Sequence, residues 1–138
     1  MADKIQLRIV TPTRLVVDEE VDEVTAPGVL GQFGVLPNHI AFLTLLQPGE
    51  LSYKQGGRLT RLAIAGGYAE VLENVMTVLA DAAEFAEEID VARAQRAKER
   101  AEKNISGLNI DDREFAICEA ALARATARIE VARPETRR

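Results

Sequence analysis

The stretch LTRLAIAGGYAEVLENVMTVL, residues 59–79, decides the fold of the N-terminal part of the chain. It contains three short runs of strand-forming residues, separated by the turn-forming pairs Gly66-Gly67 and Glu73-Asn74. Runs this short, with turn residues and no helical segment between them, are typical of consecutive antiparallel strands. The stretch therefore predicts antiparallel β structure rather than strands that alternate with helices.

The same pattern extends toward the N-terminus. Within residues 5–9, the apolar residues Ile5, Leu7 and Ile9 alternate with polar ones, as expected for a strand with one wet face. Turn signals then recur at intervals of roughly ten residues, at Thr11-Pro12, Pro27-Gly28, Pro37-Asn38, Pro48-Gly49 and Gly56-Gly57. These features predict an antiparallel β-sandwich or barrel that extends to about residue 84.

The last third of the chain is predicted to be helical, because alanine is concentrated there and glycine is nearly absent. Asp90 can cap the start of a first helix, and Ile89 and Ala94 occupy the two positions of a hydrophobic staple. This helix should end near Ile105, since Gly107 can adopt the left-handed conformation that closes helices.

A second helix is predicted from Asp111 or Asp112 to about Val131. With Asp111 as the cap, Glu114 lies at the capping-box position. The loop between the two helices is short, which requires an antiparallel hairpin.

Each helix carries an apolar stripe at heptad-like spacing. The stripe is rich in alanine, so it buries little apolar area and stabilises the hairpin only modestly. We therefore expect a hairpin that can detach from the β structure or extend at modest cost. The stripes are Ala94, Ala97, Ala101 and Ile105 in the first helix, and Phe115, Cys118, Leu122, Ala125, Ile129 and Ala132 in the second.

Composition and charge exclude several classes of function. The chain has 138 residues, of which 47% are hydrophobic, so it can form a globular core. A net charge of -5 argues against non-specific nucleic-acid binding. The charge is unevenly divided, since residues 1–88 carry 6 basic and 13 acidic residues whereas residues 89–138 carry 11 basic and 9 acidic ones. This asymmetry indicates two surfaces with different partners.

The sequence contains no recognisable catalytic or metal-binding constellation. Its single histidine, His39, and its two serines, Ser52 and Ser106, form no nucleophile motif, and no phosphate-binding loop is present. The single cysteine, Cys118, excludes a disulfide framework. The residues 1–4 lack the pattern of a signal peptide, and no apolar run is long enough to span a bilayer, so a cytoplasmic protein is expected.

Four segments, in order, resemble those of a known family. They are GQFGVLPNH at residues 31–39, AGGYAEV at 65–71, VMTVLAD at 75–81 and IDVARA at 89–94. Together they resemble the epsilon subunit of the bacterial proton-translocating ATP synthase. The resemblance covers essentially the whole chain. It implies a sandwich of about ten antiparallel strands in residues 1–86, followed by a C-terminal antiparallel α-helical hairpin in residues 87–138 that acts as a mobile regulatory element.

The resemblance also implies a function. It indicates a non-catalytic subunit of the central stalk, or rotor, which binds the gamma subunit and the ring of c subunits and couples ring rotation to the catalytic head. It implies that the hairpin inhibits ATP hydrolysis by rising to meet the catalytic beta and the alpha subunits. Such a subunit requires no cofactor and no metal, and it is peripheral at the cytoplasmic face of the bacterial plasma (inner) membrane. Basic residues available to the raised hairpin are Arg93, Arg96, Lys98, Arg100, Arg113, Arg124 and Arg128.

By the same resemblance, the loop from Val29 to His39 faces the c-ring. Gln32 stands where an acidic residue is common in relatives, so a charge-based contact is not expected at that position. The alternative is that the glycines and proline of this segment only shape a turn. The residues implied in the ring contact are Gly31, Gln32, Phe33 and His39.

In some relatives the folded hairpin binds ATP without hydrolysing it. The matching positions are Glu84, Ile89, Asp90, Arg93, Ala94, Arg100, Arg124 and Arg128. Arginines can donate paired hydrogen bonds to phosphates, and Glu84 or Asp90 could accept from the adenine amino group. The alternative is structural, because capping already explains Asp90 and a solvated helix face would explain Arg124. Capping does not explain Arg93, since a capping box would favour Glu or Gln there.

Three other interpretations of the sequence compete with this one. The chain could be a β-sandwich adaptor unrelated to ATP synthase, with a generic coiled-coil hairpin. It could be a small hydrolase, but the missing nucleophile–base pair argues against that class. It could also be a factor that inserts its hairpin into another enzyme's channel, but the β-first order of the chain argues against it.

Overall fold

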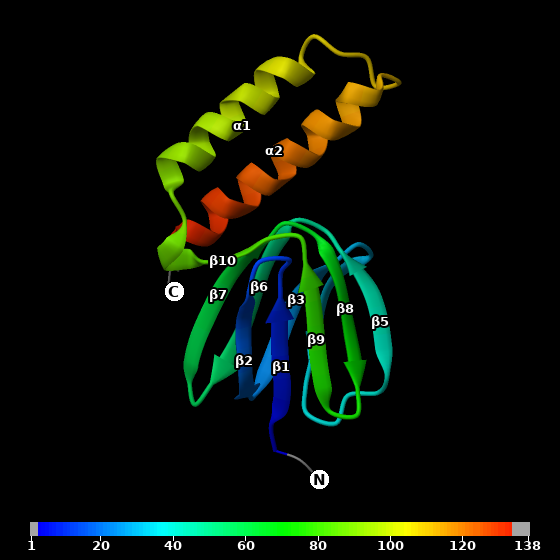
Figure 1. Ribbon diagram of the computed structural model, residues 1–138, viewed down its shortest axis with the longest axis vertical. Helices are drawn as coiled ribbons and strands as arrows, with labels where there is room; N and C mark the ends of the chain where they lie inside the picture. The colour runs from blue at the N-terminus through cyan, green and yellow to red at the C-terminus, as the bar shows by residue number, and fades with distance from the viewer. Residues whose placement is uncertain (1–2, 134–138) are drawn as a thin grey trace.

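The computed structural model describes residues 3–133, which form a β-sandwich with a helical hairpin at one end (Figure 1). The outer limits of the two predicted domains, residues 1 and 138, lie outside the described residues. The strands are β1 (Ile5–Val10), β2 (Leu15–Val21), β3 (Glu23–Gly28), β4 (Gly31–Val35), β5 (Phe42–Leu46), β6 (Gly49–Gln55), β7 (Arg58–Ile64), β8 (Gly67–Leu72), β9 (Val75–Ala80) and β10 (Ala83–Phe85). The helices are the short 3-10 helix η1 (Ala86–Glu88), α1 (Val91–Ile105) and α2 (Arg113–Ala132).

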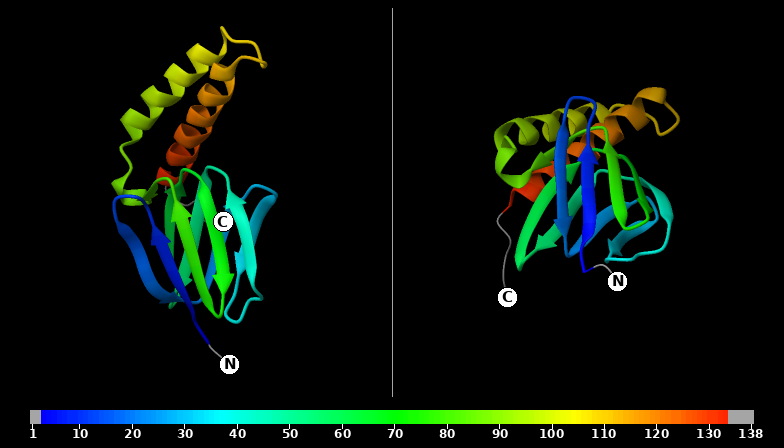
Figure 2. Two further views of the ribbon diagram at one scale, coloured as in Figure 1. Left: turned by 45° about the vertical axis from the view of Figure 1, so that its right-hand side comes forward. Right: turned by 60° about the horizontal axis from the view of Figure 1, so that its bottom comes forward.

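The strands are arranged in two layers, which the views in Figures 1 and 2 show from different sides. The order β10-β7-β6-β3 forms one layer and β5-β8-β9-β1-β2 the other, while β4 pairs with β3 alone. The layers are joined where Gly28 of β3 pairs with Leu46 of β5. The predicted sandwich of about ten strands is confirmed.

One strand pairing differs from the antiparallel expectation. β1 runs parallel to β9, with Leu7 opposite Met76 and Ile9 opposite Val78. The other pairings are antiparallel. The sequence pattern reveals strand direction only where a tight turn joins two neighbours, and β1 and β9 are separated by most of the sandwich.

The core follows the alternation noted in the sequence. Ile5, Leu7 and Ile9 of β1 are fully buried, as are Leu51 of β6 and Leu62 of β7 from the opposite layer. Side chains on the inner faces of the two layers therefore pack together, as in other sandwiches. This interior is continuous through all the long strands and provides a stiff base for the hairpin.

The start of α1 is as predicted, and the start of α2 is partly different. The carboxylate of Asp90 accepts a hydrogen bond from the Arg93 N–H at 3.0 Å and caps α1. At α2 the cap is Asp112 rather than Asp111, and the capping box with Glu114 does not form. Instead, the Asp112 carboxylate accepts from the Asn109 N–H at 2.9 Å, because the tight inter-helix turn presents that donor first.

The hairpin contacts the sandwich through a small apolar cluster. Ala63 of β7, Ile89 of the linker and Val131 of α2 are buried there, with Ala86 and Ala132 packed partly against them. Figure 2 shows the helices leaning away from the strands beyond this point. Because apolar burial stabilises in proportion to area, this contact holds the hairpin far less strongly than the sandwich core holds itself.

Candidate functional site

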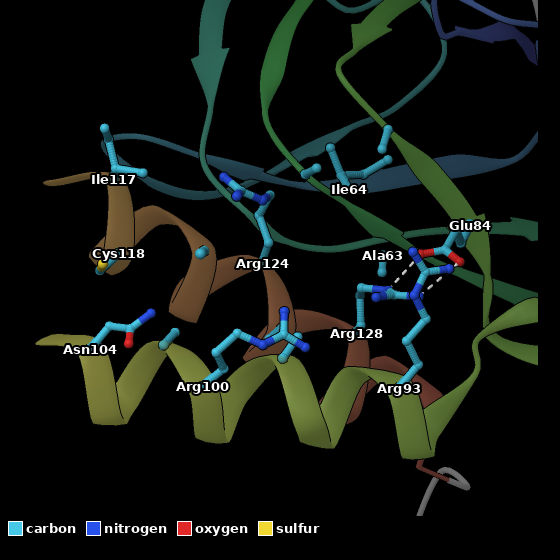
Figure 3. Close-up of a pocket in the computed structure, with 16 residues that line it drawn as sticks. Ala63, Ile64, Glu84, Arg93, Arg100, Asn104, Ile117, Cys118, Arg124 and Arg128 are labelled. Atoms are coloured by element: carbon cyan, nitrogen blue, oxygen red, sulfur yellow. Dashed lines mark hydrogen bonds and ion pairs between the residues drawn. The ribbon is translucent and has the colours of Figure 1, made fainter. Parts of the chain in front are cut away.

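A cleft lies between the hairpin and the edge of the sandwich (Figure 3). Its volume is about 620 Å³, within the range of about 300–1,000 Å³ that is typical of small-molecule sites. The floor is built from residues of β7 and β10 and those beside them, and three of the five are alanines, which leaves room above the sheet. The floor residues are Ala63, Ile64, Ala65, Ala82 and Glu84, and the remaining wall comes from α1 and α2.

Four arginines line this cleft. Arg93 and Arg100 lie two turns apart on α1, and Arg124 and Arg128 lie one turn apart on α2. Because the two helices run antiparallel over the same floor, both pairs of side chains reach into one space, as Figure 3 shows. Five of the eight residues predicted for nucleotide binding, these four and Glu84, thus share a single cleft.

Within the part of the chain that the structure describes, one of the four arginines, Arg128, is paired. Arg128 donates to both oxygens of Glu84, with Nε–Oε1 at 2.7 Å and Nη2–Oε2 at 3.3 Å. Within residues 3–133, the guanidinium groups of Arg93, Arg100 and Arg124 have no hydrogen bond or ion pair. Three unpaired cations around one cleft favour an anionic ligand, and guanidinium groups suit phosphates and carboxylates best.

The other three predicted residues lie outside the cleft lining and have structural contacts. Ile89 is buried under the foot of the hairpin, and Ala94 is fully buried on the inner side of α1. Asp90 caps α1. These contacts determine where α1 begins, and so they position the Arg93 side chain at the cleft.

Part of the segment predicted to face the c-ring is strand rather than loop. Residues 31–35 form β4, which pairs with β3 because Gly28 and Gly31 close a tight hairpin between them. Gly31 has a φ of 128°, a backbone conformation that non-glycine residues rarely adopt. Leu30, at the tip of this turn, is 98% exposed.

The residues implied in the ring contact are spread along the sandwich, with Gly31 and Gln32 at one end and His39 at the other. Gly31 and Gln32 lie at the hairpin end, because Gly28, opposite Gly31, also pairs with Leu46 near the start of β8. His39 lies at the far end, where the neighbouring Asn38 N–H donates to the Asn74 side chain in the β8–β9 turn. The rings of Phe33 and His39 both pack against Phe42, with centroid distances of 5.3 and 5.9 Å. The structure therefore does not bring all four residues to one surface.

The outer face of β5, β8 and β9 exposes a row of large apolar side chains. Leu45, Tyr68 and Leu79 are in register across the three strands, and each lies on the solvent side. Leu43 and Leu72 lie farther along the same face of β5 and β8, where the exposed Glu70 is opposite Leu43 and between Tyr68 and Leu72. We call the five apolar residues the apolar face. Contiguous exposed apolar surface on a small domain is typical of a protein-binding site.

Comparison with known proteins identifies the family. Residues 4–86 match the beta-sandwich domain of the ATP synthase delta/epsilon chain, and residues 87–133 match its long alpha-helix domain. The chain belongs to the ATP synthase delta/epsilon family. It is similar to the ATP synthase epsilon chain of Geotalea daltonii, with 51% identity over 138 residues and full coverage of both chains. The epsilon chain of Syntrophobacter fumaroxidans is 55% identical over 132 residues, covering 96% of this chain and 98% of the relative.

Solved structures agree with this assignment. A chain in the mitochondrial ATP synthase of Euglena gracilis, in a complex of OSCP, F1 and c-ring, is 26% identical with a TM-score of 0.80, covering 92% of this chain and 80% of that one. A chain in the central stalk and c-ring of the Tetrahymena thermophila enzyme shares the fold at 13% identity, with a TM-score of 0.69 and coverage of 93% and 96%. The protein is thus an epsilon-chain family member and a non-catalytic part of ATP synthase.

Two further observations bear on metals and membranes. Within residues 3–133, no group of three His, Cys, Asp or Glu side chains is placed to hold a metal ion. None of the helices in the described part of the chain combines the length and the apolar character needed to cross a bilayer.

Two arginines in the sandwich make contacts that sequence reasoning missed. Arg14, in the β1–β2 turn, pairs with Glu88 of η1 at 3.2 Å. Arg61, in β7, reaches across to α2. A single arginine in a strand or turn is usually a solvated residue, so no motif in the sequence marks either contact.

Proposed function

We propose that the protein is the rotor subunit that couples c-ring rotation to the catalytic head, and that its hairpin inhibits ATP hydrolysis. The observation that supports this proposal is the small apolar contact between the hairpin and the sandwich. The apolar cluster that joins the hairpin to the sandwich has only three buried members, Ala63, Ile89 and Val131, and it is separate from the sandwich core. Beside it α2 is held by polar contacts from Arg61 and to Glu84, so the hairpin can leave the sheet without disrupting the sandwich core. The raised hairpin would present its basic residues to the beta and alpha subunits.

Truncating the chain after Glu88 tests the inhibitory role. We expect ATP hydrolysis by membranes carrying the truncated chain to rise several-fold, because the inhibitory arm is absent while the sandwich remains. Immunoblots against the sandwich would show that equal amounts of subunit are assembled. Unchanged hydrolysis would confine the hairpin to assembly or coupling and contradict inhibition.

Two surfaces of the sandwich suit the two rotor partners. We assign the apolar face around Leu45 and Tyr68 to the gamma subunit, since large exposed apolar side chains gathered on one face favour binding of another protein. We assign the exposed β3–β4 turn, with Leu30, Gly31 and Gln32, to the c-ring. With these contacts the subunit would be peripheral at the cytoplasmic face of the bacterial plasma membrane.

We further propose that the arginine-lined cleft binds ATP as a regulatory ligand that is not hydrolysed. Arg93, Arg100 and Arg124 have guanidinium groups without partners in the described chain, and they would surround the phosphates. Of the two carboxylates considered for the adenine amino group, Glu84 lines the cleft and Asp90 does not, so we assign Glu84. ATP bridging both helices and the floor would hold the hairpin down.

Calorimetric titration of the full chain with ATP tests this site. Arg124→Ala should weaken ATP binding by about tenfold or more, because it removes a charge-assisted contact to phosphate. Arg113→Ala is the matched control, since Arg113 begins the same helix but lies outside the cleft lining. The site is ruled out if the unmodified chain gives no heat at ATP concentrations on the order of 1 mM, or if the two variants weaken binding equally.

A further inference from the structure

Arg61 joins the sandwich to the carboxyl end of α2. Its Nη1 donates to the Arg133 carbonyl oxygen at 2.8 Å, and its Nη2 lies 3.3 Å from the Glu130 carbonyl oxygen. The Arg61 side chain is only 18% exposed, although it belongs to a strand at the surface. The guanidinium group is therefore enclosed between two parts of the chain that are far apart in sequence.

The end of α2 has a particular need for this contact. The last turn of a helix leaves carbonyl oxygens without intrahelical donors and carries partial negative charge. The last turn of α2 has no basic residue of its own and contains the acidic Glu130. Arg61 of β7 therefore supplies the positive charge and the hydrogen-bond donors that the end of α2 lacks. It can do so only while the hairpin lies on the sandwich.

A neighbouring carboxylate keeps Arg61 in place. Glu50 of β6 accepts from Arg61 Nε at 2.9 Å and from Nη2 at 2.6 Å. This pair lies wholly within the sandwich, so it would persist when the hairpin leaves. The guanidinium group then stays charged, partnered and oriented for the helix to return.

We propose that Arg61 is a latch that holds the hairpin in its folded position without nucleotide. The proposal rests on the hairpin movement proposed above, but not on ATP binding, because Arg61 is absent from the lining of the cleft. Removing the latch should raise the ratio of detached to folded hairpin by about tenfold, since hydrogen bonds from a charged donor are among the stronger ones in proteins.

A buried cysteine at the foot of the hairpin can report this ratio. Val131 is 1% exposed at the contact with the sandwich. In the full chain with Cys118→Ala, a Val131→Cys thiol should react with a small thiol reagent only when the hairpin detaches. The reaction rate then follows the detached population even when that population is small. The measurement uses the isolated chain without nucleotide, so failure of inhibition or of ATP binding would not affect it.

Three variants separate the latch from other roles of Arg61. Arg61→Ala should accelerate labelling of the reporter about tenfold. Arg58→Ala, which removes an exposed arginine from the same strand, should leave the rate unchanged. Glu50→Gln should accelerate labelling much less than Arg61→Ala, because both Arg61 contacts use a single Glu50 oxygen. The glutamine side chain keeps one oxygen acceptor, so Arg61 and its donors to α2 stay in place.

A second reporter separates detachment of the hairpin from general destabilisation. Val78→Cys, in the sandwich core, becomes reactive only when the sandwich opens. The latch requires that Arg61→Ala accelerate labelling at position 131 more than at position 78. Equal acceleration at both positions, no acceleration at position 131, or an equal effect of Glu50→Gln would overturn it.

Discussion

Replacing Leu45 by aspartate is expected to weaken binding to the gamma subunit more than about 100-fold. Leu45 lies in the middle of the apolar face and is 62% exposed in the isolated chain. An aspartate buried in the interface would have to lose its hydration, which is costly for an ionised side chain. The loss should appear when ATP synthase depleted of this chain is titrated with the labelled variant.

A matched variant controls for the charge itself. Ile110→Asp also replaces an exposed aliphatic side chain by aspartate. Ile110 is 78% exposed and lies in the loop between α1 and α2, away from the apolar face. This variant should bind the depleted complex like the unmodified chain. Both variants should keep the thermal transition of the sandwich, because neither replaced side chain is part of the core. If folded Leu45→Asp binds with unchanged affinity, the apolar face is not the gamma contact.

Local sequence signals predict where helices and strands begin and end better than they predict which strands pair with each other. Asp90 and Gly107 predicted both ends of α1 to within a residue or two, because capping depends on a few adjacent residues. The parallel pairing of β1 with β9 has no comparable signal, since it joins segments separated by most of the sandwich. The strand β4 was missed because its glycines indicated a loop, whereas pairing with β3 stabilises it as a strand.

In the cleft, too, the sequence predicts features that depend on neighbouring residues but not contacts between residues far apart in the chain. Helical spacing places Arg124 and Arg128 on one face of α2, and this could be predicted from the sequence alone. That Arg128 pairs with Glu84, 44 residues away, depends on how the hairpin is seated. The contact of Arg61 with the end of α2 is beyond sequence reasoning for the same reason. Residues that hold two domains together are thus harder to predict than residues that form either domain.

Gly67→Ala is expected to reduce the free energy of unfolding of the sandwich by about 3 kcal/mol or more. A Cβ atom at this position would lie 2.0 Å from the Leu79 carbonyl oxygen, which is backbone of the neighbouring strand and cannot rotate away. Gly67 also has a φ of 127°, which an L-alanine adopts only with strain. Urea unfolding followed by tyrosine fluorescence, to which Tyr53 in the core contributes, would measure the change.

Gly57→Ala separates the collision from the backbone strain. Gly57 has a φ of 84°, but a Cβ atom there would meet no other atom within 4 Å. This variant should therefore lose only about 1 kcal/mol, from the positive φ alone. The difference between the two variants measures the cost of separating β8 from β9 at the point where the chain turns toward β10 and the hairpin. Equal losses in the two variants would mean that β8 and β9 can move apart freely, and the sandwich would then not be the stiff base that a movable hairpin requires.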